Sequence, residues 1–537
     1  MDDKQTKSVD GKDDVAYLTR DMSSDAESPI DIIPDVKHAN RDAAGGDSDE
    51  REGTLWENIQ RNRPACFWAL FISLCLVMEG YDLGATNSFF GLDEYKQKFG
   101  QLNSDGTKSV SAVWQTGVSN ASYSGQFIGL CIGGYLVEKI GYRRVSMGGM
   151  AWISAVWFIV FFAPSIVVVA VGEGLIGMGL GIFQSLTTAY ASEILPVSLR
   201  GYLTSWSCAG WGIGLILAAT IVRGGLDIEG TWAYKMPWVL VWVWPPILGL
   251  GCYFAPESPW WLSRKGRDED AKRSLARLNT GPADEARIER SLALIKYTNM
   301  LEEEEVKGTT FLDCFRGVNL RRTELCALVF CIQIWSGAPM NSFAVVFLQQ
   351  AGVDERRSFD FGVGINAMFL VGTLLSWTYL SRLGRKTIYL IGLTIMAVIA
   401  LLVGVLGVVP HSDAVALGAG ALCTIGPLCY TIIAEIASTR LRAKTIALAR
   451  AAYTLSNIIT NILQPRMISE SAWGWGAKCG WFWFGFCILT IIYTYFRIPE
   501  TKDRSYAEID ILFNNKVSAR KFKSTKLDAF ALSKDHH

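Results

Sequence analysis

The chain has 537 residues, of which 50% are hydrophobic and 19% are charged, and its formal net charge is zero. This apolar content exceeds what a soluble enzyme of this size needs. The sequence has no basic stripe and no alternation of basic and aromatic residues, which argues against nucleic-acid binding. The charges gather in residues 1–63, 257–322 and 499–537 and leave long stretches between them nearly uncharged.

Residues 1–62 are acidic, polar and rich in Asp, Ser and Lys, which predicts a disordered cytoplasmic tail without a cleavable signal peptide. Apolar segments long enough to cross a hydrocarbon core of about 30 Å follow this tail. Pro164 separates the third segment from the fourth. The twelve predicted membrane helices run over 65–87, 111–137, 145–163, 167–190, 201–222, 236–256, 323–349, 359–380, 387–409, 414–435, 445–466 and 478–498.

Lys and Arg between these helices indicate their orientation. The loop after the second helix carries Lys139, Arg143 and Arg144, and basic residues also follow the eighth and tenth helices. All these loops lie on the same side as both termini and the basic 257–322 segment. Because cytoplasmic loops carry an excess of Lys and Arg, we expect this side to face the cytoplasm.

Glycines recur at every fourth position of two predicted helices. Gly125, Gly129 and Gly133 lie in the second helix, and Gly177 and Gly181 lie in the fourth. Small residues at this spacing let two helix backbones approach closely. The pattern therefore predicts close packing of these helices.

Three short motifs return once along the chain at nearly the same spacing. Two six-helix halves, 63–256 and 323–498, explain the repeat. A cytoplasmic linker with short helices would join them at 257–322, and a cytoplasmic tail would follow at 499–537. The repeated motifs are residues 141–144 and 384–386, offset by 243, residues 193–200 and 435–442, offset by 242, and residues 256–258 and 499–501, offset by 243.

These motifs carry a resemblance to a known family. Over roughly residues 60–520 the chain resembles the major facilitator superfamily and, within it, the sugar porters. The resemblance implies an all-α integral membrane protein whose twelve transmembrane helices form two halves around a sugar site. The motifs are the Arg143-Arg144 turn, Glu193-Ile194-Leu195-Pro196 with Arg200-Gly201, PESPWWL at 256–262, LGRK at 383–386 and PETKDRSYAEID at 499–510.

Other motifs resemble those of the fungal α-glucoside/proton symporters. This closer resemblance implies a plasma-membrane protein that carries an α-linked di- or oligosaccharide, such as maltose, together with a proton. The sugar, the proton and the lipid bilayer are then the expected partners. The motifs are Glu79-Gly80-Tyr81-Asp82, Phe183-Gln184-Ser185, Tyr190-Ala191-Ser192-Glu193 and residues 473–478.

The family resemblance also implies a network of charges at the cytoplasmic helix ends, which is broken and remade as the two halves alternate. The other interpretation is that these charges only set the topology or extend to the membrane surface. The predicted gating residues are Glu138, Arg143, Arg144, Glu193 and Arg200 in the first half and Arg385, Glu435 and Arg442 in the second.

Four charged residues fall in the interior of predicted membrane helices, away from the helix ends, where each costs several kcal/mol unless it is paired or solvated. Glu79 and Asp82 lie three residues apart and share one face of the first helix. Glu173 lies in the fourth helix and Arg450 in the eleventh. In the family, the acid at the position of Asp82 binds the proton, so we expect these four residues to couple proton movement to transport. The alternative is a static Asp82–Arg450 pair that holds helices together.

The sequence departs from its relatives at a few positions. Gln126 stands where the α-glucoside symporters usually have Glu, and Glu173 stands where hexose porters have Arg. Cys208 and Leu215 replace polar residues of the maltose-type relatives. Because of these departures, an uncoupled facilitator and a porter for another sugar or a polyol remain alternative functions. A sugar sensor that does not transport is a further alternative.

A sugar site needs polar groups for hydroxyls and aromatic faces for the C–H surface of the ring. The seventh helix carries Gln333 and Trp335 in a segment that resembles the sugar porters' Gln-Gln-x-Ser-Gly motif, and Asn341 follows two turns later. Gln184 and Gln126 are further predicted ligands. Asn457 and Asn461 are weaker candidates, because an isolated Asn or Gln can also form an interhelical hydrogen bond.

No arrangement typical of an enzyme, a cofactor site or a metal site occurs in the sequence. It contains no phosphate-binding loop, no nucleophile elbow and no zinc-ligand spacing. The cysteines are scattered singly, mostly within apolar runs. The four histidines lie outside the predicted helix cores, which excludes a histidine proton relay.

Overall fold

The computed structural model describes residues 55–102, 106, 108–280, 285–306, 310–350, 353–380, 383–406, 436, 441–469, 472–502, 509, 512–522 and 525. Within these ranges the side chains of Arg200 and Arg442 are not described. Glu435 and the tenth predicted helix, 414–435, lie outside the described residues.

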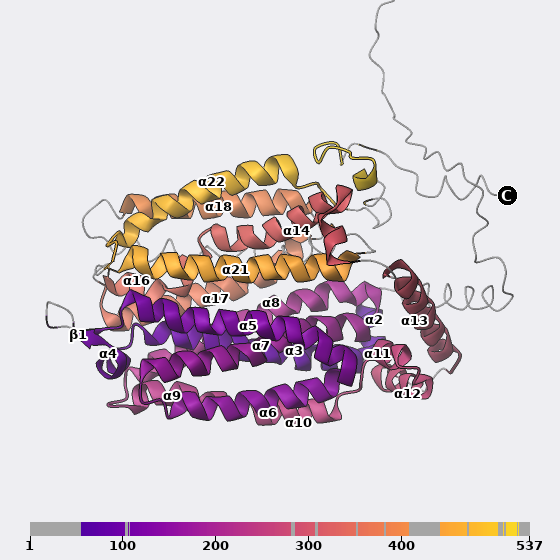
Figure 1. Cartoon of the computed structure of the whole chain (residues 1–537), viewed down its shortest axis with the longest axis horizontal. Helices are drawn as coiled ribbons and strands as arrows, with labels where there is room; N and C mark the ends of the chain where they lie inside the picture. The colour runs from indigo at the N-terminus through magenta and orange to yellow at the C-terminus, as the bar shows by residue number, and fades with distance from the viewer. Residues whose placement is uncertain are drawn as a thin grey trace, which may run out of the picture.

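Long helices running side by side make up most of the molecule (Figure 1). The first half is built from α3 to α10, apart from the short α4, and the second half from α14 to α22. The helices of the first half are α3 (Arg63–Phe89), α5 (Ala112–Ile140), α6 (Tyr142–Phe161), α7 (Ile166–Ile194), α8 (Val197–Gly225), α9 (Trp232–Val241) and α10 (Trp244–Phe254). Those of the second half are α14 (Gly317–Trp335), α15 (Ala338–Ser342), α16 (Ala344–Gln350), α17 (Glu355–Leu380), α18 (Arg385–Leu406), α21 (Arg442–Ile468), η5 (Gly476–Lys478) and α22 (Cys479–Arg497).

The seventh predicted span is not one helix, which corrects the sequence prediction. Helix α14 ends at Trp335, and Gly337 then adopts a left-handed conformation with φ of +103°. Pro339 follows within the first turn of α15, where its missing N–H is tolerated. The chain crosses this region as three successive helices. The sixth span is likewise divided between α9 and α10, where Pro245 lies in the first turn of α10.

Short elements mark the two ends of the bundle (Figure 1). We call the end that carries α11, α12 and α13 the linker end and the end that carries the β1–β2 hairpin the hairpin end. Helix α2 occupies residues at the end of the predicted disordered tail, so that tail does not extend to residue 62. The elements are α2 (Leu55–Arg61), α11 (Pro259–Arg264), α12 (Asp268–Leu278), α13 (Glu285–Val306) and η2 (Phe311–Phe315) at the linker end, and α4 (Asp93–Phe99), β1 (Gln101–Leu102) and β2 (Lys108–Ser109) at the hairpin end.

Glycines allow α5 and α7 to pack backbone against backbone, as the sequence predicted. A Cβ atom added at Gly129 would lie 2.0 Å from the Met178 carbonyl oxygen, and one at Gly177 would lie 2.1 Å from that of Ser122. Only glycine fits such a contact. Within the first half, α3 packs mainly on α8, whereas α5 packs on α21 and α8 on α17 across the two halves.

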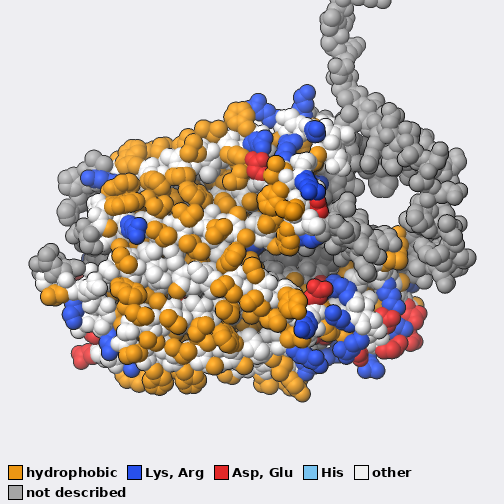
Figure 2. Space-filling view, in the orientation of Figure 1, with side chains coloured by type: hydrophobic (Ala, Val, Ile, Leu, Met, Phe, Trp, Pro, Cys, Tyr) orange, Lys and Arg blue, Asp and Glu red, His pale blue; other side chains and the backbone are white. Residues whose placement is uncertain are grey.

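On the face shown in Figure 2, hydrophobic side chains cover much of the helices, and charged side chains gather at the two ends. Large hydrophobic residues such as Phe158, Leu250, Val398 and Leu489 are exposed on the long helices. Among the described residues, nine helices are long and apolar enough to cross a membrane. An apolar surface of this length is what a lipid bilayer requires.

Part of the predicted C-terminal tail packs on the second half at the linker end. The rings of Phe513 and Phe522 are fully buried. The Arg322 guanidinium carbon lies 4.6 Å from the centre of the Phe513 ring. Arg321 donates a hydrogen bond of 3.1 Å to the carbonyl of Val517. Residues 512–522 are therefore a docked segment of the fold.

Candidate functional site

A cavity lies between the two halves. Helices α3, α5 and α8 line it from the first half, and α14, α15, α16, α17 and α21 line it from the second. Its walls combine amide and hydroxyl side chains with large aromatic rings. The polar residues that line it are Asn87, Ser88, Gln333, Ser336, Asn341, Ser342, Asn366, Asn457 and Asn461, and the aromatic ones are Tyr123, Trp211, Phe359, Phe369 and Tyr453.

The cavity contains some of the predicted ligands. Gln333 and Asn341 both line it, although they belong to different helices, because the break at Gly337 separates α14 from α15. Asn457 and Asn461 line it from one face of α21. Asn461 also donates a hydrogen bond of 2.8 Å to the Asn457 carbonyl, a local bond within the helix.

Three predicted ligands do not line this cavity. The Trp335 ring packs against Phe486 of α22, with 4.7 Å between ring centres. The Gln184 amide donates hydrogen bonds to Glu79 and, at 3.4 Å, to Gln126. Gln184 thus contacts a buried acid within the first half, and Gln126 contacts Gln184.

Several cavity residues were not predicted. Trp211 lies one turn before Leu215 in α8, so both face the cavity, and Phe369 contacts Trp211 from α17 with 5.8 Å between ring centres. Asn366, an isolated amide within an apolar span, also lines the cavity. Such an amide was the one signal in the sequence that could have indicated a lining residue in α17. The aromatic residues gave no signal, because Phe and Trp occur throughout this chain.

Three carboxyl groups are buried within the first half. Glu79, Asp82 and Glu173 are 3%, 2% and 1% exposed, respectively. Glu79 accepts the hydrogen bond from Gln184 and interacts electrostatically with Arg450 of α21. Arg450 therefore acts on Glu79, whereas the sequence suggested a pair with Asp82.

Asp82 and Glu173 have a different environment. Thr86, one turn after Asp82 in α3, donates a hydrogen bond of 3.1 Å to Oε1 of Glu173 in α7. Within the described part of the chain, Oδ2 of Asp82 and Oε2 of Glu173 have no hydrogen-bond partner. The two carboxyl groups also interact electrostatically with each other.

Arg450 lies against aromatic rings of the second half. Its guanidinium carbon is 4.8 Å from the centre of the Phe330 ring and 5.6 Å from that of Tyr453. Because a guanidinium is weakly hydrated and stacks on aromatic faces, these rings hold the cation at the boundary between the halves.

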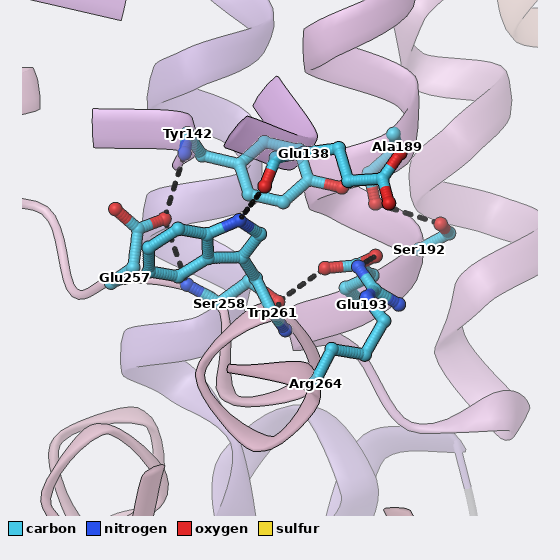
Figure 3. A network of polar contacts seen from close by, with 9 residues as sticks. All are labelled: Glu138, Tyr142, Ala189, Ser192, Glu193, Glu257, Ser258, Trp261 and Arg264. Carbon is cyan, nitrogen blue, oxygen red and sulfur yellow. Dashed lines mark hydrogen bonds and ion pairs between the residues drawn. The ribbon is translucent and has the colours of Figure 1, made fainter. Parts of the chain in front are cut away.

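The linker end carries a polar network that joins α11 to the first half (Figure 3). Glu257 accepts backbone hydrogen bonds of 2.9 Å from Tyr142 and 3.2 Å from Arg143, and so caps α6. Trp261 donates a 2.9 Å hydrogen bond to the carbonyl of Glu138. Burial raises the pKa of the Glu257 carboxyl above its usual value.

Glu193 belongs to this network as well. Its carboxylate accepts a hydrogen bond from the Ser258 hydroxyl and forms an ion pair of 2.7 Å with Arg264 of α11 (Figure 3). Among the predicted gating charges, Arg143 has its guanidinium carbon 4.6 Å from the centre of the Tyr253 ring, and the Glu138 side chain is exposed. Arg144 lines a surface pocket together with Glu257 and the α12 residues.

The second half repeats the helix cap. Glu500 accepts a 2.8 Å hydrogen bond from the backbone N–H of Arg385 at the start of α18. A Cβ atom at Gly384 would lie 2.1 Å from Oε2 of Glu500, and one at Gly141 would lie 2.7 Å from Oε2 of Glu257. Two of the three motif pairs read from the sequence, 141–144 with 384–386 and 256–258 with 499–501, thus hold equivalent positions in the two halves.

Polar contacts join the halves at the hairpin end. Lys96 donates a hydrogen bond of 3.1 Å to the side chain of Gln349, which itself donates one of 2.9 Å to the carbonyl of Gly91. Asn120 of α5 donates a hydrogen bond of 3.3 Å to the Ile458 carbonyl of α21. These contacts hold the hairpin ends of the halves together.

Comparisons with known proteins agree with this architecture. The family model described as "Sugar (and other) transporter" matches residues 68–513. The general alpha-glucoside permease of Saccharomyces cerevisiae is 37% identical over 527 residues, which cover 96% of this chain and 85% of that protein. The maltose permease MAL31 of the same organism is 36% identical over 518 residues, or 94% of this chain and 84% of that protein.

Solved structures are similar as well. The inward open conformation of the xylose transporter XylE from E. coli superposes with a TM-score of 0.68 at 19% identity, over 83% of this chain and 98% of that chain. The proton:xylose symporter XylE bound to 6-bromo-6-deoxy-D-glucose gives the same TM-score and identity over 84% of this chain and 100% of that chain. At this identity the likeness concerns the fold.

Proposed function

Because the chain belongs to the sugar transporter family and has the major facilitator fold that its motifs predicted, we propose that it carries an α-glucoside across the plasma membrane together with a proton. Its twelve helices would form two halves that alternately expose the cavity to either side of the membrane.

The observation that supports this function best is the composition of the cavity between the halves. Gln333, Asn341 and Asn366 offer both donors and acceptors to sugar hydroxyls, while Trp211 and Phe369 offer flat apolar faces. Sugars combine hydroxyl edges with an apolar ring face, so this mixture suits them.

Similarity to the yeast permeases favours an α-linked glucoside as the substrate. The two relatives named above are an alpha-glucoside permease and a maltose permease, and both match along nearly the whole chain. Leu215 lines the cavity, so at this position the wall is apolar. A disaccharide that presents a C–H face toward α8 would fit such a wall.

Proton coupling is supported by the buried carboxyl groups of the first half. Glu79 and Asp82 share a helix, α3, with the cavity residues Asn87 and Ser88. A carboxyl in apolar surroundings can take up and release a proton as its access to water changes.

The linker end would face the cytoplasm. Lys and Arg are abundant in the short loops at this end and in the segment 257–322, as expected for cytoplasmic loops. Both termini would then be cytoplasmic, and the contacts between Lys96 and Gln349 would close the path to the outside. The Glu193–Arg264 and Glu257 contacts would be gating contacts that change as the halves move.

Uptake of labelled sugars by a transport-deficient yeast that expresses the chain tests this function. We expect maltose or a related α-glucoside to accumulate and the external medium to become more alkaline as it enters. Uptake without proton movement would instead indicate the uncoupled facilitator. Binding without uptake, in cells that display the protein at the surface, would indicate a sensor.

A further inference from the structure

The three buried carboxyl groups of the first half are not equivalent. Glu79 has a hydrogen-bond donor, the Gln184 amide, and a cation, Arg450, that interacts with it. A carboxylate with both a donor and a positive charge nearby is stabilised in its ionised form. These two partners offset part of the cost of burying a charge at Glu79.

Asp82 and Glu173 do not have both a donor and a cation. Within the described residues, neither carboxyl group forms a hydrogen bond or an ion pair with Lys, Arg or His, and the one hydrogen bond that reaches either of them comes from the Thr86 hydroxyl. Asp82 and Thr86 are four residues apart and share one face of α3. Because Thr86 contacts Glu173, this face brings the carboxyl group of α7 beside Asp82.

The other titratable groups around this pair do not compensate its charge. Glu79 on the same helix would repel it. Tyr81 interacts with Asp82, but its hydroxyl donates to the Pro237 carbonyl at 2.7 Å. Tyr95 of α4 interacts with Glu173, and its ring packs between Phe89 and other aromatic rings.

Burial of two adjacent carboxylates without a cation is costly, because each loses its hydration and repels the other. A proton on one carboxyl group removes one charge and supplies a donor for the other. Among the residues that the structure describes, Oδ2 of Asp82 and Oε2 of Glu173 are buried without a hydrogen-bond partner, so each is available to hold such a proton. Two carboxyl groups that share a proton titrate as one unit.

We propose that Asp82 and Glu173 together form the proton-binding site, and that Glu79, which has a donor and a cation as partners, is not part of it. Before it binds the transported proton, the pair holds one shared proton and a single negative charge. It takes up one further proton, so that both carboxyl groups become neutral, and releases that proton to water on the other side. This inference rests on the proposed proton symport and assigns the proton to a pair of acids rather than to Asp82 alone.

Two substitutions with opposite expected effects test the pair. Glu173→Gln keeps the acceptor for Thr86 but gives Asp82 a permanent amide donor, which stabilises the Asp82 anion. We expect coupled uptake to need a more acidic medium, with the pH profile displaced by about one unit. Thr86→Val keeps the side-chain shape and removes the donor to Glu173, so we expect a displacement of about half a unit or more toward alkaline pH.

The measurements are the accumulation ratio of labelled sugar and sugar-dependent alkalinisation across a range of external pH. Counterflow exchanges sugar without net proton movement and therefore reports on folding and sugar binding. We expect the counterflow rate of each single variant to lie within about threefold of the wild-type rate. The double variant Asp82→Asn/Glu173→Gln should equilibrate sugar without alkalinisation. Glu324→Gln is the matched control, because that carboxylate already pairs with Arg497 at 2.8 Å and should leave the pH profile unchanged.

Each outcome bears on the proposal. Unchanged pH profiles in Glu173→Gln and Thr86→Val, with loss of coupling in Asp82→Asn, would overturn the pair in favour of a single carboxyl group. A displacement of the pH profile in the same direction in both variants would also overturn the pair, because the pair predicts displacements in opposite directions. Sugar uptake by the wild type without proton movement would instead refute the proposed symport. Proton movement by the wild type is therefore measured before the variants are compared.

Discussion

Nε of Arg223 lies 2.6 Å from Oδ1 of Asp360, and this ion pair joins the two halves at the hairpin end. A second pair, Arg356 with Asp227 at 2.8 Å, crosses the same boundary. Arg223 also lies 3.6 Å from Asp227 within the first half. Each half thus contributes one base and one acid to a four-residue network between α17 and the C-terminal end of α8 with the turn that follows it.

This network holds the two halves together at the hairpin end. Neutralising it should favour the state in which the halves separate there and the cavity opens at the hairpin end. Exposed ion pairs contribute about 0.2–1 kcal/mol each, so we expect Asp360→Asn to raise the open population by up to about fivefold. A cysteine placed at the cavity residue Ser88 reports this state through its labelling rate with a membrane-impermeant maleimide. The exchanged pair Arg223→Asp/Asp360→Arg should restore slow labelling, and equal rates in all variants would argue against a role in closure.

The cavity predicts which residues of the seventh span bind sugar. Gln333 lines the cavity, whereas Trp335 packs against Phe486 outside it. Loss of one hydrogen bond to a hydroxyl costs about 1 kcal/mol, so we expect Gln333→Ala to raise the KM for the sugar by about fivefold. Trp335→Phe should change it little. A larger effect of Trp335→Phe than of Gln333→Ala, measured as initial uptake against sugar concentration, would contradict this placement.

Close contact between α5 and α7 makes their glycines sensitive to a single methyl group. A Cβ atom at Gly129 would meet the Met178 carbonyl at 2.0 Å, whereas one at Gly134 of the same helix meets nothing within 4 Å. Overpacking costs about 1–3 kcal/mol, so Gly129→Ala should lower the melting temperature of the detergent-solubilised protein. Gly134→Ala is the matched control and should keep or slightly raise it, because alanine favours a helix over glycine. Equal melting of the two variants would show that the backbones can separate at no cost.

The parts of the fold that depend on local chemistry were visible in the sequence. Membrane spans follow from uninterrupted apolar runs, and the α5–α7 contact follows from glycines at every fourth position. The equivalent positions of Glu257 and Glu500 follow from a repeat whose offset can be read directly. Trp335 shows the limit of this reasoning. It lies two residues after Gln333 in the same apolar run, and only the direction of its side chain places it outside the cavity.

Partners of charged groups could not be predicted, because they come from segments distant in sequence. Glu193 was predicted to belong to a network of gating charges, but Arg264 of α11, with which it forms an ion pair, was not among the predicted residues. Arg450 was placed near Asp82, yet it acts on Glu79, which lies on the same face of α3 one turn earlier. A pattern gives the face of a helix that a residue occupies. It does not give the helix that packs on that face.

The cap formed by Glu257 predicts a pH-dependent stability. Burial outweighs the backbone hydrogen bonds from Tyr142 and Arg143 and raises the pKa of this carboxyl above its ordinary value of 4.5. The folded protein therefore binds this proton more tightly than the unfolded chain does. The resulting stabilisation is fully present below the unfolded pKa and is lost as the pH rises through the raised pKa.

The glutamine side chain of Glu257→Gln stays neutral at every pH and can still accept one of the two backbone hydrogen bonds. The stability of this variant therefore lacks the pH dependence that Glu257 gives to the wild type. We expect the melting temperature of the wild type, relative to that of Glu257→Gln, to fall as the pH is raised from about 4 to 7. Glu257→Ala should melt earlier than Glu257→Gln throughout, because the N–H groups of Tyr142 and Arg143 then lose their acceptor at the start of α6. A wild-type advantage that grows with pH would mean that those N–H groups stabilise the anion more strongly than burial penalises it, and the sign of the shift would be reversed.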